Sequence, residues 1–146
     1  MTKVVGEISY KMGVFIGDVS YVLSQDVYAE IYKPDNKAHY GLVHDPASGH
    51  DFMIAGTAYG DGCYRDQHGT QYSVDAGNIG IVPTELVDPE KITLFSRLGH
   101  DLYTDLGLYV EGAGTVLFEA QDGIFDIRFQ NGKYIHINTK NSTFVY

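Results

Sequence analysis

Three strand-like runs separated by two tight-turn dipeptides make up most of the C-terminal third of the chain. The runs are GTVLFEAQ, IFDIRFQ and KYIHINT, and the dipeptides between them are Asp122-Gly123 and Asn131-Gly132. Asp-Gly and Asn-Gly are the strongest short-range signals for a β-hairpin, because both residues tolerate the positive φ of a two-residue turn. The sequence therefore predicts an antiparallel meander over residues 114–139.

A period of two runs through the middle strand of this meander. Phe125, Ile127 and Phe129 share one face, whereas Asp126 and Arg128 share the other. Successive side chains of a strand point to opposite sides of a sheet. The alternation therefore predicts one buried face and one solvated face.

Short runs rich in valine, isoleucine, tyrosine and phenylalanine also fill the earlier part of the chain, interrupted by glycine, aspartate and asparagine. Further strands are predicted at Val14–Gly17, Tyr40–His44, Asp51–Thr57, Gln71–Asp75, Ile79–Val82 and Leu106–Glu111. Many short antiparallel strands without a βαβ rhythm favour a mainly β fold of the α+β class. We expect a small antiparallel β-barrel or a strongly curved sheet.

One short covering helix is predicted to lie over an open end of that sheet. Ser24 can cap it, Asp26 stands in its first turn, and Val27 and Ile31 share one face before Pro34. These features predict a short helix.

A second, weaker helical turn is predicted after Pro83, in the segment TELVDPEKI. Pro89 is expected to keep it short, because proline cannot donate a backbone hydrogen bond inside a helix. We expect the stretch Leu86–Gly107 to be mainly a long loop packed over the barrel.

Length and composition are those of one domain, residues 1–146. The chain has 146 residues, of which 44% are hydrophobic, enough to bury a single core. Its formal net charge of -9 repels phosphate backbones and anionic lipids, which disfavours direct binding to nucleic acid or to a membrane. The acidity suits a protein that presents carboxylates to a basic partner, although solubility alone explains it more simply.

Cysteine content and hydropathy indicate the cellular compartment of the protein. A single cysteine, Cys63, excludes an intramolecular disulfide. No stretch approaches the roughly 18 apolar residues of a membrane span, and the N-terminal segment lacks the apolar run of a secretory signal. We expect a soluble, cytoplasmic protein.

The run from Gly56 to Pro83 is the strongest candidate for a functional region. Glycine at this density indicates positive φ values or close backbone approach, and the aspartates between the glycines suggest tight turns with exposed oxygen atoms. Interleaved tyrosines supply rigid apolar area with a polar tip, which suits a binding surface. Asp18, which follows the predicted strand Val14–Gly17, is added to the residues of this run. The candidate binding residues are therefore Asp18, Tyr59, Asp61, Tyr64, Tyr72 and Asp75.

The expected geometry is a shallow site. If Tyr59 and Tyr64 flank the turn at Gly60–Gly62 on paired strands, their rings lie on one face beside Asp61. The simpler interpretation is that the aspartates only form turns and that the tyrosines line the barrel wall.

Neighbouring carboxylates allow two kinds of chemistry. The turn aspartates Asp61, Asp66 and Asp75, joined by Asp18, could gather a hard cation, or could split their pKa values to act as an acid and a base. The spacing after Asp61 does not match a calcium-binding loop, and the scattered histidines show no zinc spacing. We therefore expect no metal and no cofactor.

Four short motifs lie between Val14 and Pro83. They are IGDxxYV at Ile16–Val22, TAYGDGxY at Thr57–Tyr64, YxVDAG at Tyr72–Gly77 and IGIVP at Ile79–Pro83. Together they resemble a recurring pattern in small, uncharacterised bacterial and phage proteins. The resemblance implies a stable β fold with a shared site, and it carries over no catalytic role.

These observations favour a non-enzymatic binding or inhibitory module of the kind that phages encode. It would use the tyrosine and aspartate surface of the central run to hold a small molecule or a protein partner. One alternative is a small hydrolase or isomerase with Asp18, Asp61 or Asp75 as base or metal ligand in a concave pocket. Another is a structural component of a virion or larger assembly, and the exposed edges of an open sheet make a homodimer an option.

Overall fold

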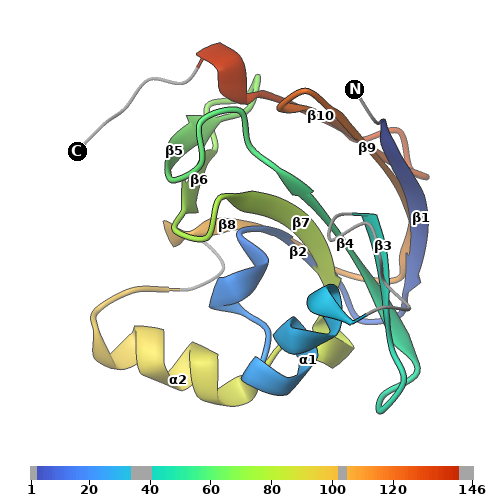
Figure 1. The fold of residues 1–146 in the computed structure, drawn as a ribbon, viewed down its shortest axis with the longest axis vertical. Helices are drawn as coiled ribbons and strands as arrows, with labels where there is room; N and C mark the ends of the chain where they lie inside the picture. The colour runs from blue at the N-terminus through green and yellow to red at the C-terminus, as the bar shows by residue number, and fades with distance from the viewer. Residues whose placement is uncertain (1–2, 34–40, 102–104, 142–146) are drawn as a thin grey trace.

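The fold is built mainly from antiparallel β-sheet, which confirms the predicted class. A computed structural model of the chain describes residues 3–33, 41–101 and 105–141. It contains three antiparallel sheets and two short α-helices, and both helices lie at the bottom of Figure 1. Pro34 and Tyr40, predicted to follow the helix and to begin a strand, lie outside the described residues.

The four-stranded sheet contains the predicted C-terminal meander. In spatial order its strands are β1 (Val4–Tyr10), β9 (Gly114–Gln121), β10 (Ile124–Phe129) and β11 (Tyr134–Asn138). Asp122 and Gly123 have φ values of 54° and 78°, the positive values of a two-residue hairpin turn. Burial alternates along β10, with Phe125 inside and Asp126 on the outer face, which confirms the predicted period of two.

The five-stranded sheet contains most of the other predicted strands. In spatial order they are β3 (Gly41–Asp45), β4 (His50–Gly56), β7 (Asn78–Pro83), β2 (Val14–Gly17) and β8 (Gly107–Val110). Strands β2 and β7 are buried along their whole length. Their nearly continuous apolar sequences fit this position, because the sheet has a hydrophobic core on each face.

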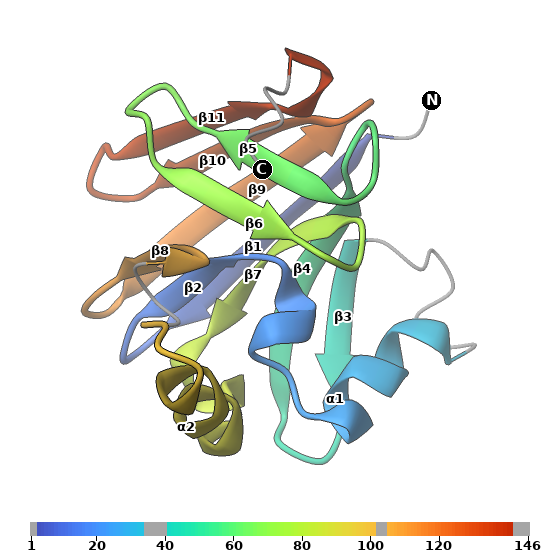
Figure 2. The ribbon, with the colours of Figure 1, turned by 90° about the vertical axis from the view of Figure 1, so that its left-hand side faces the viewer.

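The two-stranded sheet is a hairpin that connects the edges of the other two sheets. Its strands are β5 (Gly62–Arg65) and β6 (Gln71–Val74), seen in front of the other strands in Figure 2. Asp66, just after β5, forms an antiparallel bridge with Ile137 of β11. On the other side of the hairpin, the backbone N–H of Ser73 donates to the carbonyl oxygen of Leu106, next to β8 (3.3 Å).

An inner core fills the space that the three sheets enclose. Every sheet contributes to it, for example through Ile8, Ile16, Tyr72, Phe118 and Ile135, all of them buried. Each fully buried side chain of this size contributes roughly 1.5–3 kcal/mol relative to an exposed one. The three sheets therefore depend on one shared interior.

A second, outer core lies between the five-stranded sheet and the helices. Its buried members include Phe15, Val22, Ile31, Phe52 and Leu86. The sheet residues among them point away from the inner core, so the helical segments close the far side of the sheet.

Helix α1 (Gln25–Ala29) confirms the predicted covering helix. The Ser24 hydroxyl caps it by accepting a hydrogen bond from the backbone N–H of Val27 (3.3 Å). The 3₁₀ turn η2 (Glu30–Tyr32) continues it and places Ile31 in the outer core.

The 3₁₀ turn η4 (Thr84–Leu86) confirms the predicted helical turn after Pro83. Helix α2 (Pro89–Arg97) corrects two other predictions, a single covering helix and a long loop over Leu86–Gly107. The Asp88 side chain caps α2 by accepting from the backbone N–H of Glu90 (3.0 Å), and Pro89 is its first residue. Proline is well suited to that position, because the first N–H of a helix has no intrahelical partner to lose. Pro89 therefore begins the helix instead of limiting it.

Neither helix is suited to cross a bilayer. Across the described ranges, the structure contains no helical segment with both the length and the hydropathy that a membrane span requires.

Candidate functional site

Asp18 is the structural centre of the region that the sequence singles out. It follows β2 and caps the 3₁₀ turn η1 (Val19–Tyr21), with one carboxylate oxygen accepting from the backbone N–H of Ser20 (2.9 Å). The other oxygen accepts from the backbone N–H groups of Asp75 and Ala76, both at 2.7 Å. Asp18 is 0% exposed. Its carboxylate therefore fastens the turn after β6 to the end of β2.

Asn78 supports the same connection, and the sequence analysis does not identify it. Its side-chain oxygen accepts from the backbone N–H of Val19 (3.1 Å), and its amide donates to the carbonyl oxygen of Ala76 (3.3 Å). Asn78 is buried. A polar residue at the start of an otherwise apolar strand, NIGIVP, is the signal that could have identified it.

The loop from Thr57 to Asp61 packs directly on the turn that Asp18 holds. The backbone N–H of Thr57 donates to the carbonyl oxygen of Gly77 (3.0 Å), and its hydroxyl donates to that of Gly60 (2.6 Å). A Cβ added at Gly77 would lie 3.6 Å from the Cα of Gly60. The two exposed carboxylates, Asp61 and Asp75, therefore stand on adjoining loops.

Tyr21 lies where these carboxylates meet, and it too was missed at the sequence level. Burial raises the pKa of its phenol well above the ordinary value, and a hydrogen bond with Asp75 raises it further. The charges of Asp75, Asp18 and Asp61 act in the same direction. The structure thus brings the three predicted aspartates together around one neutral phenol.

We call the group formed by Asp18, Tyr21, Tyr59, Asp61 and Asp75 the acidic corner. Tyr59 belongs to it through its position in the 57–61 loop, and its side chain is 62% exposed. The corner therefore has a buried base, formed by Asp18, and an exposed surface with two carboxylates and one aromatic ring.

Tyr64 and Tyr72 do not belong to this surface, so the expected pair of rings framing a shallow site is wrong. The two tyrosines are paired across β5 and β6, and both are buried in the inner core. Their side chains face the inner core, whereas Tyr59 stands in solvent. Tyr64 still supports the corner from below, because its hydroxyl donates to the carbonyl oxygen of Gly60 (2.8 Å).

Tyr72 and Asp66 close the far end of the same hairpin. The Tyr72 hydroxyl donates to one carboxylate oxygen of Asp66 (2.8 Å), and the other oxygen accepts from the N–H groups of His68 and Thr70. Burial, followed by the hydrogen bond and charge of Asp66, raises the pKa of Tyr72. For Asp66 the turn-forming interpretation is therefore confirmed.

A second polar cluster lies on the outer face of the four-stranded sheet. Asp126 accepts hydrogen bonds from the Tyr134 hydroxyl and from Nδ1 of His136 (2.8 Å), and the Arg128 guanidinium lies 4.5 Å from the centre of the Tyr134 ring. Gln67, from the β5–β6 turn, accepts from the N–H of His136 and donates to the carbonyl oxygen of Tyr134. The cluster joins the hairpin to the edge strand β11.

Asp126 should make the stability of this face depend on pH. Burial alone raises its pKa, but the hydrogen bonds from Tyr134 and His136 and the nearby positive charge outweigh burial and lower it. Because the pKa of Asp126 is lower in the folded state than in the unfolded state, its ionised carboxylate stabilises the fold. This stabilisation is fully present above the ordinary aspartate pKa of about 3.9, and it is lost as the pH falls through the lower pKa of the folded state. Asp126→Asn should therefore be less stable than the wild type by about 1 kcal/mol at neutral pH.

Urea titrations at several pH values test this expectation. The difference between Asp126→Asn and the wild type should shrink as the pH is lowered from about 4 towards 2. Glu111→Gln, which removes an exposed carboxylate, is the control and should differ little from the wild type at any pH. A gap for Asp126→Asn that stays constant over this range would contradict the expectation.

Three surface hollows lie away from the acidic corner, and the described residues of the corner form no metal-binding cluster. Within the part of the chain that the structure describes, no group of three or more His, Cys, Asp or Glu side chains is placed to hold a metal ion. A surface hollow of about 560 Å³ lies along α2, and two smaller ones, of about 170 and 200 Å³, are lined by residues of the four-stranded sheet and its adjoining turns. These hollows do not involve the residues of the corner.

Comparison of the chain with protein-family models, curated proteins and solved structures finds no match. Inferences about function therefore rest on the geometry of the chain itself.

Proposed function

We propose that the protein is a non-enzymatic binding or inhibitory module whose acidic corner receives a cationic side chain of a protein partner. The observation that carries this proposal is the position of Asp61 and Asp75. Both are exposed, both stand on loops with fixed contacts, and neither forms an ion pair with a cation of residues 3–33, 41–101 or 105–141. Two carboxylates in this arrangement can accept charge-assisted hydrogen bonds from arginine or lysine.

The buried base of the corner favours binding because it limits the motion of the exposed groups. Asp18 and Asn78 fix the turn that carries Asp75, and Tyr64 supports the loop that carries Asp61. Loops that are already ordered lose less conformational entropy when a partner binds. The formal net charge of -9 would also speed the approach of a basic partner.

Tyr59 adds an aromatic contact to the same surface. A tyrosine ring can pack against the aliphatic part of an arginine or interact with its cation through the ring face. Tyrosine is also enriched where proteins bind one another. We infer that Tyr59 packs beside the cation that Asp61 and Asp75 hold.

The scaffold behind the corner is best described as a small, strongly curved barrel. The Asp66–Ile137 bridge and the Ser73–Leu106 hydrogen bond join the edges of neighbouring sheets, and all three sheets share the inner core. Such a scaffold would hold the loops of the corner at a constant separation.

The hydrolase or isomerase alternative has less support from the geometry. Asp18 is fully buried and accepts three backbone N–H bonds, so its carboxylate cannot approach a substrate without disrupting the turn. Asp61 and Asp75 are the carboxylates that remain accessible, and they lie on a surface outside the described hollows. An exposed surface suits a protruding partner group better than an enclosed reaction.

A labelled octa-arginine peptide provides a direct test. The double variant Asp61→Asn/Asp75→Asn should bind the peptide roughly tenfold more weakly than the wild type in fluorescence anisotropy. Its free energy of unfolding should change by less than about 0.5 kcal/mol, since both side chains are exposed. In ¹H–¹⁵N spectra of the wild type, the peptide should shift the amide signals of residues 59–62 and 74–77.

The matched control is Glu7→Gln/Glu111→Gln, which removes the same number of exposed carboxylates from other strands and turns. It should keep nearly the full affinity for octa-arginine. Equal losses in the two double variants, or spectral shifts spread over the whole surface, would show that the peptide senses only net charge and would overturn the proposal.

A further inference from the structure

Helix α2 is attached to the rest of the protein along one narrow seam. The Lys91 ammonium donates to the carbonyl oxygen of Ser20 (3.3 Å), and the Phe95 ring meets the Tyr21 ring edge to face, with centroids 5.5 Å apart. No residue of α2 is buried. A helix of nine residues is too short to be stable in water by itself and depends on packing against other elements. Apart from Lys91 and Phe95, the residues of α2 are exposed, so most of its surface has no such packing.

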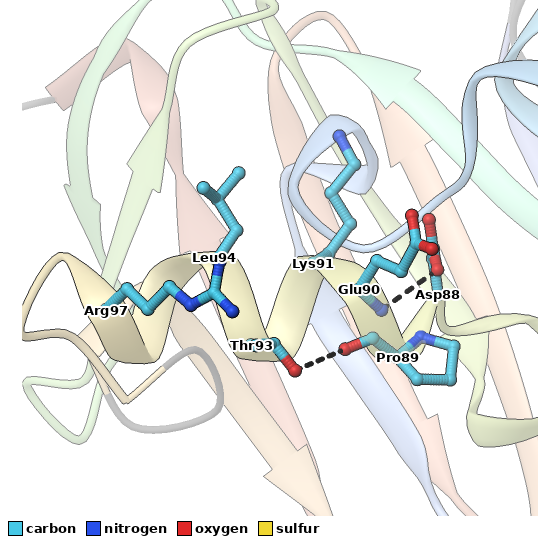
Figure 3. Close-up of a pocket in the computed structure, with 7 residues that line it drawn as sticks. All are labelled: Asp88, Pro89, Glu90, Lys91, Thr93, Leu94 and Arg97. Atoms are coloured by element: carbon cyan, nitrogen blue, oxygen red, sulfur yellow. Dashed lines mark hydrogen bonds between the residues drawn. The ribbon is translucent and has the colours of Figure 1, made fainter.

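The face of α2 beside this seam carries a continuous stripe of charged and apolar side chains. Glu90, Leu94, Arg97 and Leu98 follow the spacing i, i+4, i+7 and i+8, which places them on one side of a helix. Leu94 is 50% exposed and Leu98 is 63% exposed. Figure 3 shows Glu90 near one end of the helix and Arg97 near the other, with Leu94 between them.

The hollow of about 560 Å³ follows the same face. Among the residues that the structure describes, its lining comes from α2 and its cap: Asp88, Pro89, Glu90, Lys91, Thr93, Leu94 and Arg97. Helix α2 therefore forms one wall of a groove, and residues 3–33, 41–101 and 105–141 contribute no opposite wall.

We propose that a second copy of the chain supplies that wall, through antiparallel packing of α2 against α2 of the partner subunit in a twofold dimer. The charges on the stripe are self-complementary about its middle. Glu90 and Arg97 lie at equal distances along the helix from the point between Thr93 and Leu94. A twofold axis through that point places Glu90 of each subunit opposite the partner's Arg97 and brings the two Leu94 side chains together.

One observation and two consequences of the proposed packing favour a second copy over another occupant. Neither Glu90 nor Arg97 has an ion-pair partner within the described part of the chain. Asp88 and Glu90 stand at the start of α2 and Arg97 at its end. Antiparallel pairing therefore places each acidic end beside the partner's basic end, and it also gives the two helix dipoles a favourable antiparallel arrangement. Leu98 would also meet Pro89 of the partner subunit, which extends the apolar contact.

The size of the stripe indicates a weak dimer. Nine residues extend over about 13 Å, so the contact falls at the small end of specific interfaces. We expect concentration-dependent association in the range of about 10 µM to 1 mM. Sedimentation velocity over that range should show a monomer that converts reversibly to a dimer.

Charge exchange across the twofold axis gives the decisive experiment. Glu90→Arg alone places two arginines opposite each other at both ends of the stripe, and Arg97→Glu alone places two glutamates there. Each single variant should raise the dimer dissociation constant at least about tenfold. An equimolar mixture of the two variants should regain association, because a Glu90→Arg chain and an Arg97→Glu chain bring opposite charges together at both ends of the stripe.

Matched controls separate this interface from nonspecific effects. Glu111→Arg and Lys133→Glu make the same changes in net charge at exposed positions elsewhere and should dimerise like the wild type. Leu94→Ala should weaken the dimer, whereas Ile92→Ala, on the other flank of α2 and 38% exposed, should not. Circular dichroism of each variant confirms that α2 and the sheets remain folded.

Two results would overturn the proposal. One is a wild-type protein that remains monomeric over the whole concentration range. The other is a dimer that forms equally well in Glu90→Arg, Arg97→Glu and their mixture, which would place the interface elsewhere.

Discussion

Asp18→Ala should lower the free energy of unfolding by about 3 kcal/mol, because it leaves the partly buried backbone N–H groups of Ser20, Asp75 and Ala76 without an acceptor. For a domain of this size the loss corresponds to a decrease in Tm of roughly 10 °C. Chemical and thermal unfolding measure both quantities. The turn that carries Asp75 should also lose protection from hydrogen exchange.

Two comparisons identify the cause. Asp18→Asn keeps one acceptor oxygen and should fall between the wild type and Asp18→Ala. Asp61→Ala removes an exposed carboxylate and should cost less than about 0.5 kcal/mol. If Asp18→Ala were as stable as Asp61→Ala, the buried carboxylate would not organise the corner, and the proposed rigid base for binding would be untenable.

Gly80→Ala should lower the free energy of unfolding by roughly 3 kcal/mol or more, at least as much as Asp18→Ala, or should prevent folding altogether. A Cβ at Gly80 would lie 2.0 Å from the carbonyl oxygen of Met53 and 2.7 Å from Cγ1 of Val19. Because the first of these contacts is with the backbone of the neighbouring strand β4, no rotamer change can relieve it. Unfolding midpoints in urea and the yield of soluble protein would measure the effect.

Gly6→Ala is an informative control, because the added Cβ would contact the side chain of Met53, whereas the Cβ of Gly80→Ala would contact the backbone of Met53. A Cβ at Gly6 would lie 2.4 Å from the sulfur of Met53, near the end of a flexible side chain that can move away. We expect a cost of about 1 kcal/mol. Equal effects of Gly6→Ala and Gly80→Ala would show that the sheet can spread at Gly80 after all.

The C-terminal meander was predictable because its signals are local. The turn dipeptides and the alternation around Phe125 lie within a few residues of the contacts that they specify. Strand β1 has no such signal: Gly6 and Glu7 interrupt its apolar pattern, and its partner β9 lies in the last third of the chain. The sequence alone therefore does not show what the N-terminal segment pairs with. Strand β5 was missed for a different reason, because GCYR is short and follows a glycine-rich loop.

Only part of the acidic corner was predictable from the sequence. The density of glycine and aspartate indicated Asp61 and Asp75, which the structure places on adjoining loops. Which side chains face inward depends on the register of β5 against β6, and that register places Tyr64 opposite Tyr72 inside the core. Tyr21 was not identified, because its contacts with Asp75 and Phe95 join segments that are distant in sequence.

The pairing of β1 with β9 has a consequence for how the protein is made. Val4 pairs with Ala120 and Tyr10 pairs with Gly114, so β1 leaves the ribosome long before the strand that completes it. Chains dominated by such distant pairings fold slowly, in milliseconds to seconds. During synthesis β1 would expose an unpaired strand edge until β9 has been made, and a chaperone that covers this edge would protect the nascent chain from aggregation.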